Sequence, residues 1–294
     1  MHHLTHLLLS LIVLFFSFSN CHAEFDKSCQ VGVAKINITP DYPVLLNGYA
    51  SRGTDLINQV EQPLWARAIA VLDQQSQPHV LISVENCGVP ASVTKAVVAH
   101  LKEQHEITPA EVVVCSTHTH AAPMLTGVLP NIYTKDLSHS EQAVVDRYTG
   151  DLIQKLMIVA QQAIQDAQPA LLEWGIGTAT FAKNRRNITG PTDYDLPILR
   201  VKSPDGKSRA ILVGYACHCT TLGGVPFISG DWAGCAVEEI ETDLPGCMAM
   251  VVIGCGADQN PKFRGDDQGA ARVNGQAVAA GVQQRLKTGL TAIS

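Results

Sequence analysis

The sequence Glu111-Val-Val-Val-Cys-Ser-Thr-His-Thr-His120 runs from an apolar, β-branched segment into two histidines. Consecutive valines of this kind are typical of a buried strand. In α/β proteins, ligands bind where the carboxyl ends of such strands open into loops. Neutral imidazole nitrogens are good ligands for zinc, so the two histidines predict a metal-binding edge of a sheet.

Short apolar runs alternate with stretches of helical periodicity along the rest of the chain. We expect strands at residues 66–72, 80–84, 112–115, 198–202, 210–216 and 248–253, and helices at residues 90–106, 140–167, 235–241 and 270–286. Ser203-Pro-Asp-Gly206 has the composition of a tight turn, so the strands on either side of it should form an antiparallel hairpin. The predicted fold is α/β, with a mixed β-sheet core covered by helices and the active site at the strand carboxyl ends.

The composition is that of a globular protein with a sizeable core. Of 294 residues, 46% are hydrophobic and only 16% are charged, which argues against disorder. The formal net charge is −6 and the basic residues are scattered. Nucleic acid is therefore not the expected partner.

The amino terminus predicts export. The apolar run at residues 7–18 is too short to span a bilayer, and Cys21-His22-Ala23 resembles a cleavage site, although residues 1–6 contain no Lys or Arg. We therefore expect a signal peptide at residues 1–23, a catalytic domain at residues 24–294 and a secreted or periplasmic location. An uncleaved membrane anchor and a lipoprotein signal remain alternatives. In an oxidising compartment, a disulfide between Cys235 and Cys247 is conceivable.

Four predicted strands end in polar residues that a doubly buried strand would not need. The four ends are Glu85-Asn-Cys-Gly88, Ser116-Thr-His-Thr-His120, Cys217-His-Cys-Thr-Thr221 and Gly254-Cys-Gly-Ala-Asp-Gln-Asn260. An unpaired buried polar group costs about 1–3 kcal/mol, so such residues are expected to share one pocket.

His118 and His218 are then the natural pair of zinc ligands. Two alternatives stay open for these histidines. They could be core residues hydrogen-bonded to the backbone, or they could join Cys115, Cys217 and Cys219 in a thiolate-rich zinc site. Structural zinc sites usually carry cysteines two to four residues apart in two pairs, and that spacing is missing here.

Two further groups could serve either structure or chemistry. Asp231 precedes a predicted helix, so its carboxylate could cap the helix, or it could orient a ligand histidine or bind the metal. Arg185 could clamp a substrate carbonyl or lie in solvent.

The ordered set of motifs resembles the amino-terminal catalytic domain of the neutral (non-lysosomal) ceramidase family. The motifs are Val31-Gly-Val-Ala-Lys-Ile-Asn-Ile-Thr-Pro40, Asn47-Gly-Tyr-Ala50, Trp65-Ala-Arg-Ala68, Thr117-His-Thr-His-Ala-Ala-Pro123, Asn184-Arg185, Tyr215-Ala-Cys-His-Cys-Thr220, Ser229-Gly-Asp231 and Gly256-Ala-Asp-Gln-Asn-Pro261. They cover nearly all of the chain after the signal peptide.

This resemblance implies an enzyme that hydrolyses the amide of N-acylsphingosines with one Zn²⁺, held by two His, one Glu and one Tyr. By motif, His118 and His218 match the two ligand histidines, and His120 matches a histidine at the reacting centre. Arg185 matches an Asn-Arg pair near the pocket, where it would position the substrate. The resemblance thus implies a small-molecule or lipid substrate as the partner, and a lipid substrate would also bring the protein to a membrane surface.

Two departures from the family pattern weaken that implication. Gln259 stands where the family has a serine, and glutamine cannot act as a nucleophile. The family's Glu and Tyr ligands come from later sequence, so we expect either a carboxy-terminally incomplete domain or a shell completed by Asp231 or Asp258. Asp258 could also act as a base. A catalytically silent lipid- or carbohydrate-binding protein, and a hydrolase of another amide, lactone or sugar ester, remain alternative functions.

Overall fold

The structure is a computed structural model that describes residues 29–132 and 136–293. The predicted signal peptide at residues 1–23 lies outside these residues. Within the described parts of the chain, no helix combines the length and apolarity needed to cross a membrane.

One large sheet dominates the described residues, with strand order β4-β3-β2-β1-β5-β7-β8-β9 and β11 beside β5. Its strands are β1 (Cys29–Asn37), β2 (Trp65–Leu72), β3 (Pro78–Val84), β4 (Val112–Ser116), β5 (Gln168–Thr178), β7 (Asp195–Lys202), β8 (Ser208–Tyr215), β9 (Met248–Ile253) and β11 (Thr291–Ala292). The pairs β3–β4 and β8–β9 are parallel, and the other pairs are antiparallel. The predicted mixed sheet, including its β7–β8 hairpin, is confirmed.

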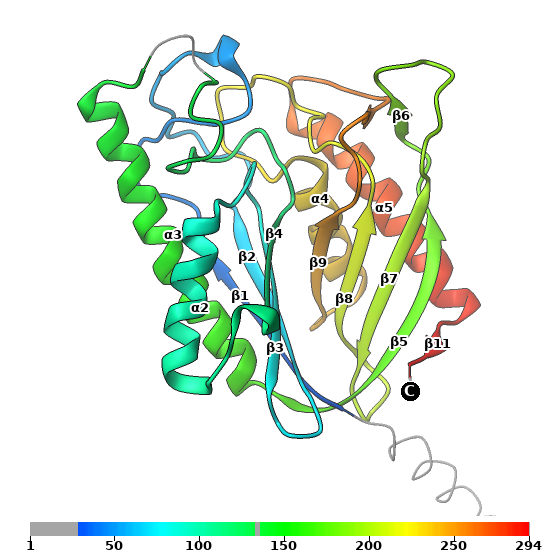
Figure 1. Cartoon of the computed structure of the whole chain (residues 1–294). Helices are drawn as coiled ribbons and strands as arrows, with labels where there is room; N and C mark the ends of the chain where they lie inside the picture. Colours follow the sequence, from blue (N-terminus) through cyan, green and yellow to red (C-terminus); the bar gives the residue numbers. More distant parts are fainter. Residues whose placement is uncertain (1–28, 133–135, 294) are drawn as a thin grey trace, which may run out of the picture.

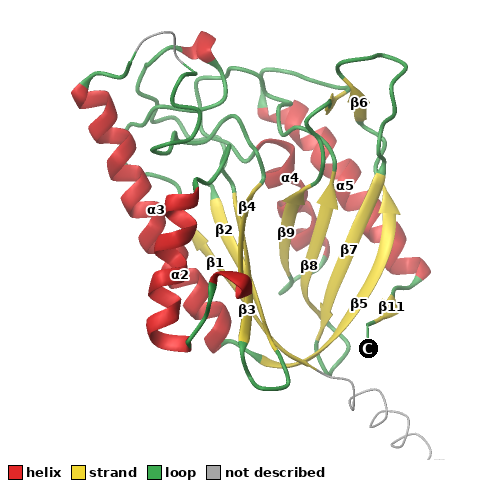
Figure 2. Cartoon of the chain, in the orientation of Figure 1, coloured by secondary structure: helices red, strands yellow, loops and turns green. Residues whose placement is uncertain are grey.

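The sheet divides into two halves because β1 and β5 pair only near one end, at Cys29–Val31. Figure 1 shows β1 to β4 on one side and β5, β7, β8 and β9 on the other, with helices outside both halves. The helices are α2 (Ala91–His105), α3 (His139–Gln165), α4 (Asp231–Asp243) and α5 (Gln268–Thr288). Figure 2 shows the same arrangement by secondary structure, with long loops gathered at one end of the strands.

The three largest apolar clusters of the described residues hold these layers together. One packs α2 and α3 against the first half-sheet, and a second packs α4 and α5 against the other half. The third lies between the half-sheets and includes Val31, Ile69 and Met250. The Ser83 hydroxyl donates to the carbonyl of Val251 at 2.6 Å, which ties β3 to β9. The carboxyl ends of both parallel pairs therefore lie at one end of the molecule.

Several local predictions were wrong. Helix α4 begins at Asp231 rather than at residue 235. Gly230 and Gly234 have low helix propensity, so the sequence gives no helical pattern for the first turn, which is wholly buried. Strand β5 was not predicted, since Pro169, Gly175 and Gly177 interrupt its pattern. The conceivable disulfide is not formed, because Cys235 and Cys247 are free thiols.

Candidate metal and catalytic site

His118 lies just beyond the end of β4 in a strained backbone conformation. The amide of Thr117 donates to the carbonyl of Val84 at 2.9 Å, so this loop continues the β3–β4 pairing. At His118 the chain turns with φ of +62°, in the left-handed region that non-glycine residues rarely occupy. Such strain persists where surrounding structure enforces it and is common at functional sites. The turn aims the His118 ring into the loops at the strand ends.

Three imidazole rings meet at this point. The ring centroid of His118 lies 4.8 Å from that of His120 and 4.7 Å from that of His218. The His120 and His218 centroids are 5.9 Å apart. The structure thus brings together the two histidines predicted to bind zinc and the histidine predicted to act beside them.

Each ring is fixed by a backbone carbonyl at its Nδ1 atom. His118 Nδ1 lies 2.6 Å from the carbonyl oxygen of Cys87, and His120 Nδ1 lies 3.1 Å from that of Gly48. His218 Nδ1 lies 2.7 Å from the carbonyl oxygen of Gly256. A carbonyl can only accept, so each Nδ1 carries a proton, and the neutral tautomer of each ring presents its lone pair at Nε2.

The Nε2 atoms of His118 and His120 lie 3.2 Å apart. Two lone pairs at that distance repel each other unless a proton or a metal ion lies between them. In a tetrahedral zinc site with Zn–N distances of about 2.0–2.1 Å, two ligand nitrogens are about 3.3–3.4 Å apart. The donor set of this cluster therefore fits a metal ion.

Burial keeps His120 and His218 neutral. It lowers the pKa of His120 to about 3, and the neighbouring His118 and His218 lower it further. Burial also lowers the pKa of His218. Both rings are therefore unprotonated at pH 7, the state in which imidazole binds a metal or accepts a proton.

Two of the anchoring carbonyls belong to glycines that no other residue could replace without movement. At Gly48, where φ is +96°, a Cβ atom would lie 2.5 Å from Cγ and Nδ1 of His120. At Gly256, it would lie 2.6 Å from the backbone nitrogen of Cys217. Close approach to the His120 ring requires glycine at position 48, and close approach to the backbone of Cys217 requires it at position 256.

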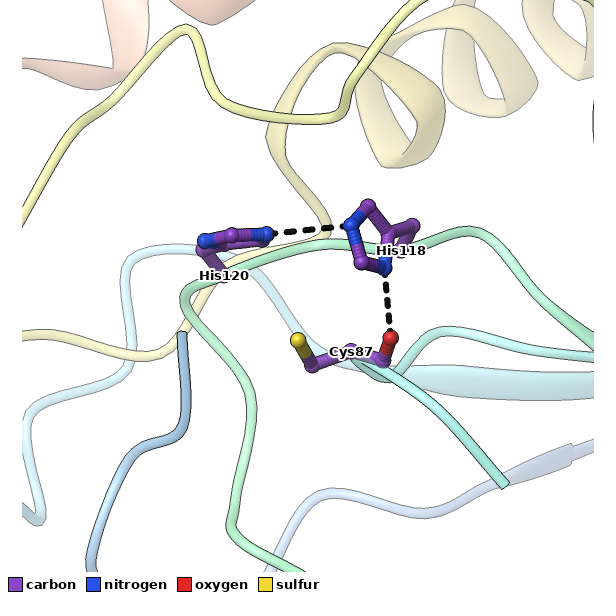
Figure 3. A group of neighbouring side chains, drawn as sticks. All are labelled: Cys87, His118 and His120. Atoms are coloured by element: carbon purple, nitrogen blue, oxygen red, sulfur yellow. Dashed lines mark hydrogen bonds between the residues drawn. The ribbon is translucent and has the colours of Figure 1, made fainter. Parts of the chain in front are cut away.

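Cys87 is the site residue that the sequence interpretation missed. Its Sγ and a ring nitrogen of each of His118 and His120 lie within 4.8 Å of one another (Figure 3). The residue is only 3% exposed, and burial raises the pKa of its thiol to about 12. The signal that could have found it was its position at the end of β3, among the four polar strand ends.

A cavity of about 190 Å³ opens beside the cluster, lined by Ser116, His118, His218, Ile253, Gly254, Gly256 and Ala257. The Nε atom of Arg185 donates to the carbonyl of Ala257 at 2.9 Å, which holds this exposed side chain at the cavity rim. The positive charge of Arg185 also contributes to lowering the pKa of His218. The structure therefore places Arg185 near the cluster.

Asp258 and Gln259 support the same loop. The Asp258 carboxylate accepts from Asn184 Nδ2 at 3.1 Å. Gln259 is 4% exposed; its side-chain oxygen accepts from the amide of Asp193 at 3.0 Å, and its carbonyl accepts from the amide of His218 at 2.8 Å. It lies in β10 (Gln259–Pro261), which pairs with β6 (Ala182–Asn184). Gln259 thus stabilises the loop after β8 that carries His218.

Asp231 has its carboxylate occupied by backbone amides. One oxygen accepts from Thr221 at 3.1 Å and from Trp232 at 2.5 Å, and the other accepts from Leu222 at 3.0 Å. The residue is 1% exposed, and burial raises its pKa. Through these contacts, Asp231 connects the loop after β8 to the start of α4. Its role as a metal ligand stays a prediction.

Comparison with known protein families gives a match. Residues 29–263 match the family described as neutral/alkaline non-lysosomal ceramidase, N-terminal. Among curated protein sequences, none matches the chain.

Two solved structures have a similar fold. One is described as ceramidase complexed with C2, with a TM-score of 0.77, 18% identity and coverage of 90% of this chain. The other is neutral ceramidase from Pseudomonas aeruginosa, with a TM-score of 0.77, 19% identity and 90% coverage of this chain. This chain spans 45% and 46% of their respective lengths.

Proposed function

Since the chain belongs to the neutral/alkaline non-lysosomal ceramidase family, we propose that it is a metal-dependent hydrolase. The bond cleaved is an amide of the N-acylsphingosine kind or a related ester. The observation that carries this proposal is the histidine cluster, in which carbonyl anchors at Nδ1 leave three Nε2 lone pairs around one point.

Zn²⁺ is the ion we propose for this cluster, because its donors are neutral imidazoles at the open end of a pocket. When bound, zinc supplies Lewis acidity and a nucleophilic water at neutral pH. The resemblance assigns the ion to His118 and His218, with His120 as the neighbouring group. His118 is common to every pairing, since it lies next to both other rings.

The chain's own residues supply the proton transfer and the substrate orientation. A histidine that is neutral at pH 7 can accept a proton from the attacking water and return it to the departing nitrogen or oxygen. Arg185, fixed at the cavity rim by Ala257, is placed to orient a carbonyl or hydroxyl of the substrate. Glutamine at position 259 is turned toward Asp193, so the proposed chemistry uses no side chain there.

The substrate proposal follows from the family and from the related structure described as ceramidase complexed with C2. A lipid amide would bring the protein to a membrane surface. A secreted or periplasmic location, after signal removal near Ala23, is part of this proposal. Sequencing the amino terminus of the exported protein tests it, and an intact Met1 would contradict it.

The test of function is hydrolysis of a panel of fluorescent N-acyl amides, esters and lactones by the purified full chain. We expect chelation to abolish turnover of at least one substrate, Zn²⁺ to restore it, and His118→Ala to lose it. The matched control is His79→Ala, a solvent-exposed histidine on β3, which should keep parental turnover. Tight binding of an N-acyl lipid without turnover would instead support the catalytically silent alternative.

A further inference from the structure

An isoleucine in the loop between β6 and β7 is almost wholly exposed to solvent. Ile188 is 96% exposed, the largest value among the exposed large apolar side chains of the described residues. Single exposed apolar residues are common on protein surfaces, so exposure alone does not indicate a function. The structure of the loop and its place in the molecule distinguish Ile188 from such residues.

Hydrogen bonds within the loop hold Ile188 outward. The side-chain oxygen of Asn184 accepts from the amides of Arg186 and Asn187, at 2.9 Å each. The side-chain oxygen of Asn187 accepts from the amide and the hydroxyl of Thr189, at 3.2 Å and 3.1 Å. These bonds fix the backbone on both sides of Ile188, so the loop cannot turn this side chain inward without breaking them. The exposed isoleucine is therefore a preorganised feature of the loop.

A leucine on a second loop is exposed in a backbone conformation that leucine disfavours. Leu129 lies in the loop after β4, is 48% exposed and has φ of +50°. In this left-handed region a bulky side chain is strained, whereas glycine or asparagine is tolerated. Strain of this kind is common at functional sites. A strained turn that presents a leucine to solvent thus indicates a role for the apolar side chain itself.

Both loops lie at the end of the molecule where the candidate site opens. Figure 1 shows the loops after β4 and β6 at the end toward which β8 and β9 point. The loop after β4 leaves the first half-sheet, and the loop after β6 leads into the second. Phe263, which follows β10 by two residues and is 51% exposed, adds an apolar side chain from a third loop. A flat partner that covered this end would meet all three.

Basic residues precede the exposed isoleucine, although the chain as a whole is acidic. Lys183, Arg185 and Arg186 are exposed and fall within four consecutive positions, in a chain of net charge −6. The acidic Asp193 and Asp195 lie at the other end of the loop, where β7 begins. Each Lys or Arg held near an anionic bilayer strengthens binding to it. Cations beside an exposed apolar side chain are typical of segments that bind at a membrane interface.

We propose that Ile188 and Leu129 insert into the interface of an anionic lipid bilayer, with Arg186 and Lys183 beside the headgroups, so that the site opening faces the membrane. This inference rests on the proposed hydrolysis of a lipid amide, because such a substrate would then reach the site without crossing water. The exposed apolar side chains lie on separate loops rather than in one groove. A fluid layer of lipid chains accommodates separate insertions of this kind, and this favours a bilayer over a protein as the partner.

The first test asks whether position 188 enters the bilayer. Ile188→Trp, in the full chain, is mixed with vesicles of equal parts phosphatidylglycerol and phosphatidylcholine whose acyl chains carry bromine, which quenches nearby tryptophan. We expect the fluorescence added by this substitution to fall by about half or more. The quencher acts only on side chains beside it, so the apolar run at residues 7–18 does not affect the result.

Ile158→Trp is the matched control for this measurement. Ile158 is 45% exposed and lies in the carboxy-terminal half of α3, which leads to the opposite end of the sheet. Its added fluorescence should not be quenched. No quenching at position 188, or equal quenching at the two positions, would overturn the proposal. A loop that served a protein partner would give the first of these results.

Partition of the full chain between buffer and vesicles without bromine measures each contribution. Ile188→Ala and Leu129→Asn should each bind about tenfold more weakly than the parent, because each removes an inserted apolar side chain. Leu129→Asn relieves backbone strain, so its melting temperature should be no lower than that of the parent. Ile158→Ala should bind as the parent does. Equal partition of the parent, Ile188→Ala and Leu129→Asn would overturn the proposal.

The role of the basic residues has its own measurement. Vesicles of phosphatidylcholine alone should bind the parent about tenfold more weakly than the anionic vesicles, and Arg186→Gln should reduce that preference. Equal binding of the parent to both kinds of vesicle would overturn the assignment of the headgroups.

These experiments separate the inference from the proposed function. Quenching at position 188 without hydrolysis of any substrate would leave the membrane contact standing and remove the proposed function. Hydrolysis of a soluble short-chain N-acyl amide by a protein that does not enter the bilayer would do the opposite.

Discussion

Replacing Gly48 with alanine should damage both stability and metal binding, because this glycine touches a ring of the cluster. An alanine at φ of +96° is strained by about 1–2 kcal/mol. Its Cβ would lie 2.5 Å from Cγ and Nδ1 of His120, so the ring must move away. That movement loses the hydrogen bond from Nδ1 to the Gly48 carbonyl and overpacks the site. We expect a total loss of about 3–5 kcal/mol in the free energy of unfolding.

Gly206→Ala is the matched control. Gly206 has φ of +85°, and a Cβ there would have no neighbour within 4 Å. It should therefore cost only the backbone strain, about 1–2 kcal/mol. Urea unfolding of the metal-free proteins measures both losses.

Metal affinity separates the ring contact from general destabilisation. Gly48→Ala should bind Zn²⁺ at least tenfold more weakly than the parent, as expected when the backbone that orients a histidine of the proposed metal cluster is disturbed. Gly206→Ala should bind with parental affinity. Equal losses of stability in the two variants, together with parental metal affinity in both, would refute the reasoning.

Three further predictions concern charge and burial. The folded-state pKa of His120 is about 3, below its ordinary value of 6.5, so the unfolded chain takes up the proton first as the pH falls. The free energy of unfolding of the metal-free protein should therefore fall by about 2 kcal/mol between pH 8 and pH 5. Urea unfolding at the two pH values should show a smaller fall for His120→Gln. Glu85→Ala should cost about 3–5 kcal/mol in urea unfolding, since the buried guanidinium of Arg67 then keeps only the carboxylate of Glu241, at 3.9 Å. A loss under 1 kcal/mol would contradict a stabilising role of the Arg67–Glu85 ion pair. Asp231→Ala removes the acceptor of three backbone amides, so it should lower the melting temperature by several degrees while metal affinity stays within tenfold of the parent. Complete loss of metal binding would instead make Asp231 a ligand.

The parts of the fold with simple periodicity could be predicted from the sequence. The valines before His118 and the regular apolar spacing in α2 and α3 identified their elements within one or two residues. Strand β5 could not be predicted, because its glycines leave room for Arg285 and Leu290 from the carboxy-terminal segment rather than carrying side chains. That requirement comes from packing between distant segments.

The sequence predicted the location of the candidate site more completely than its mechanism. Polar strand ends indicated where the histidines meet, because parallel strands share one carboxyl edge. The carbonyl anchors at Gly48 and Gly256 carry no side-chain signal, and they fix which nitrogen of each ring is free. Cys87 was named only among the strand-end residues, since nothing in the local sequence distinguishes a thiol beside the histidines from a core thiol.

The most direct test of the histidine cluster is the zinc content of the full chain after equilibrium dialysis of the metal-free protein against Zn²⁺. The proposed zinc site predicts one zinc ion per chain in the parent and less than one tenth of that in His118→Ala, with His79→Ala equal to the parent. No zinc in the parent, or equal zinc in the parent and in His118→Ala, would contradict the account.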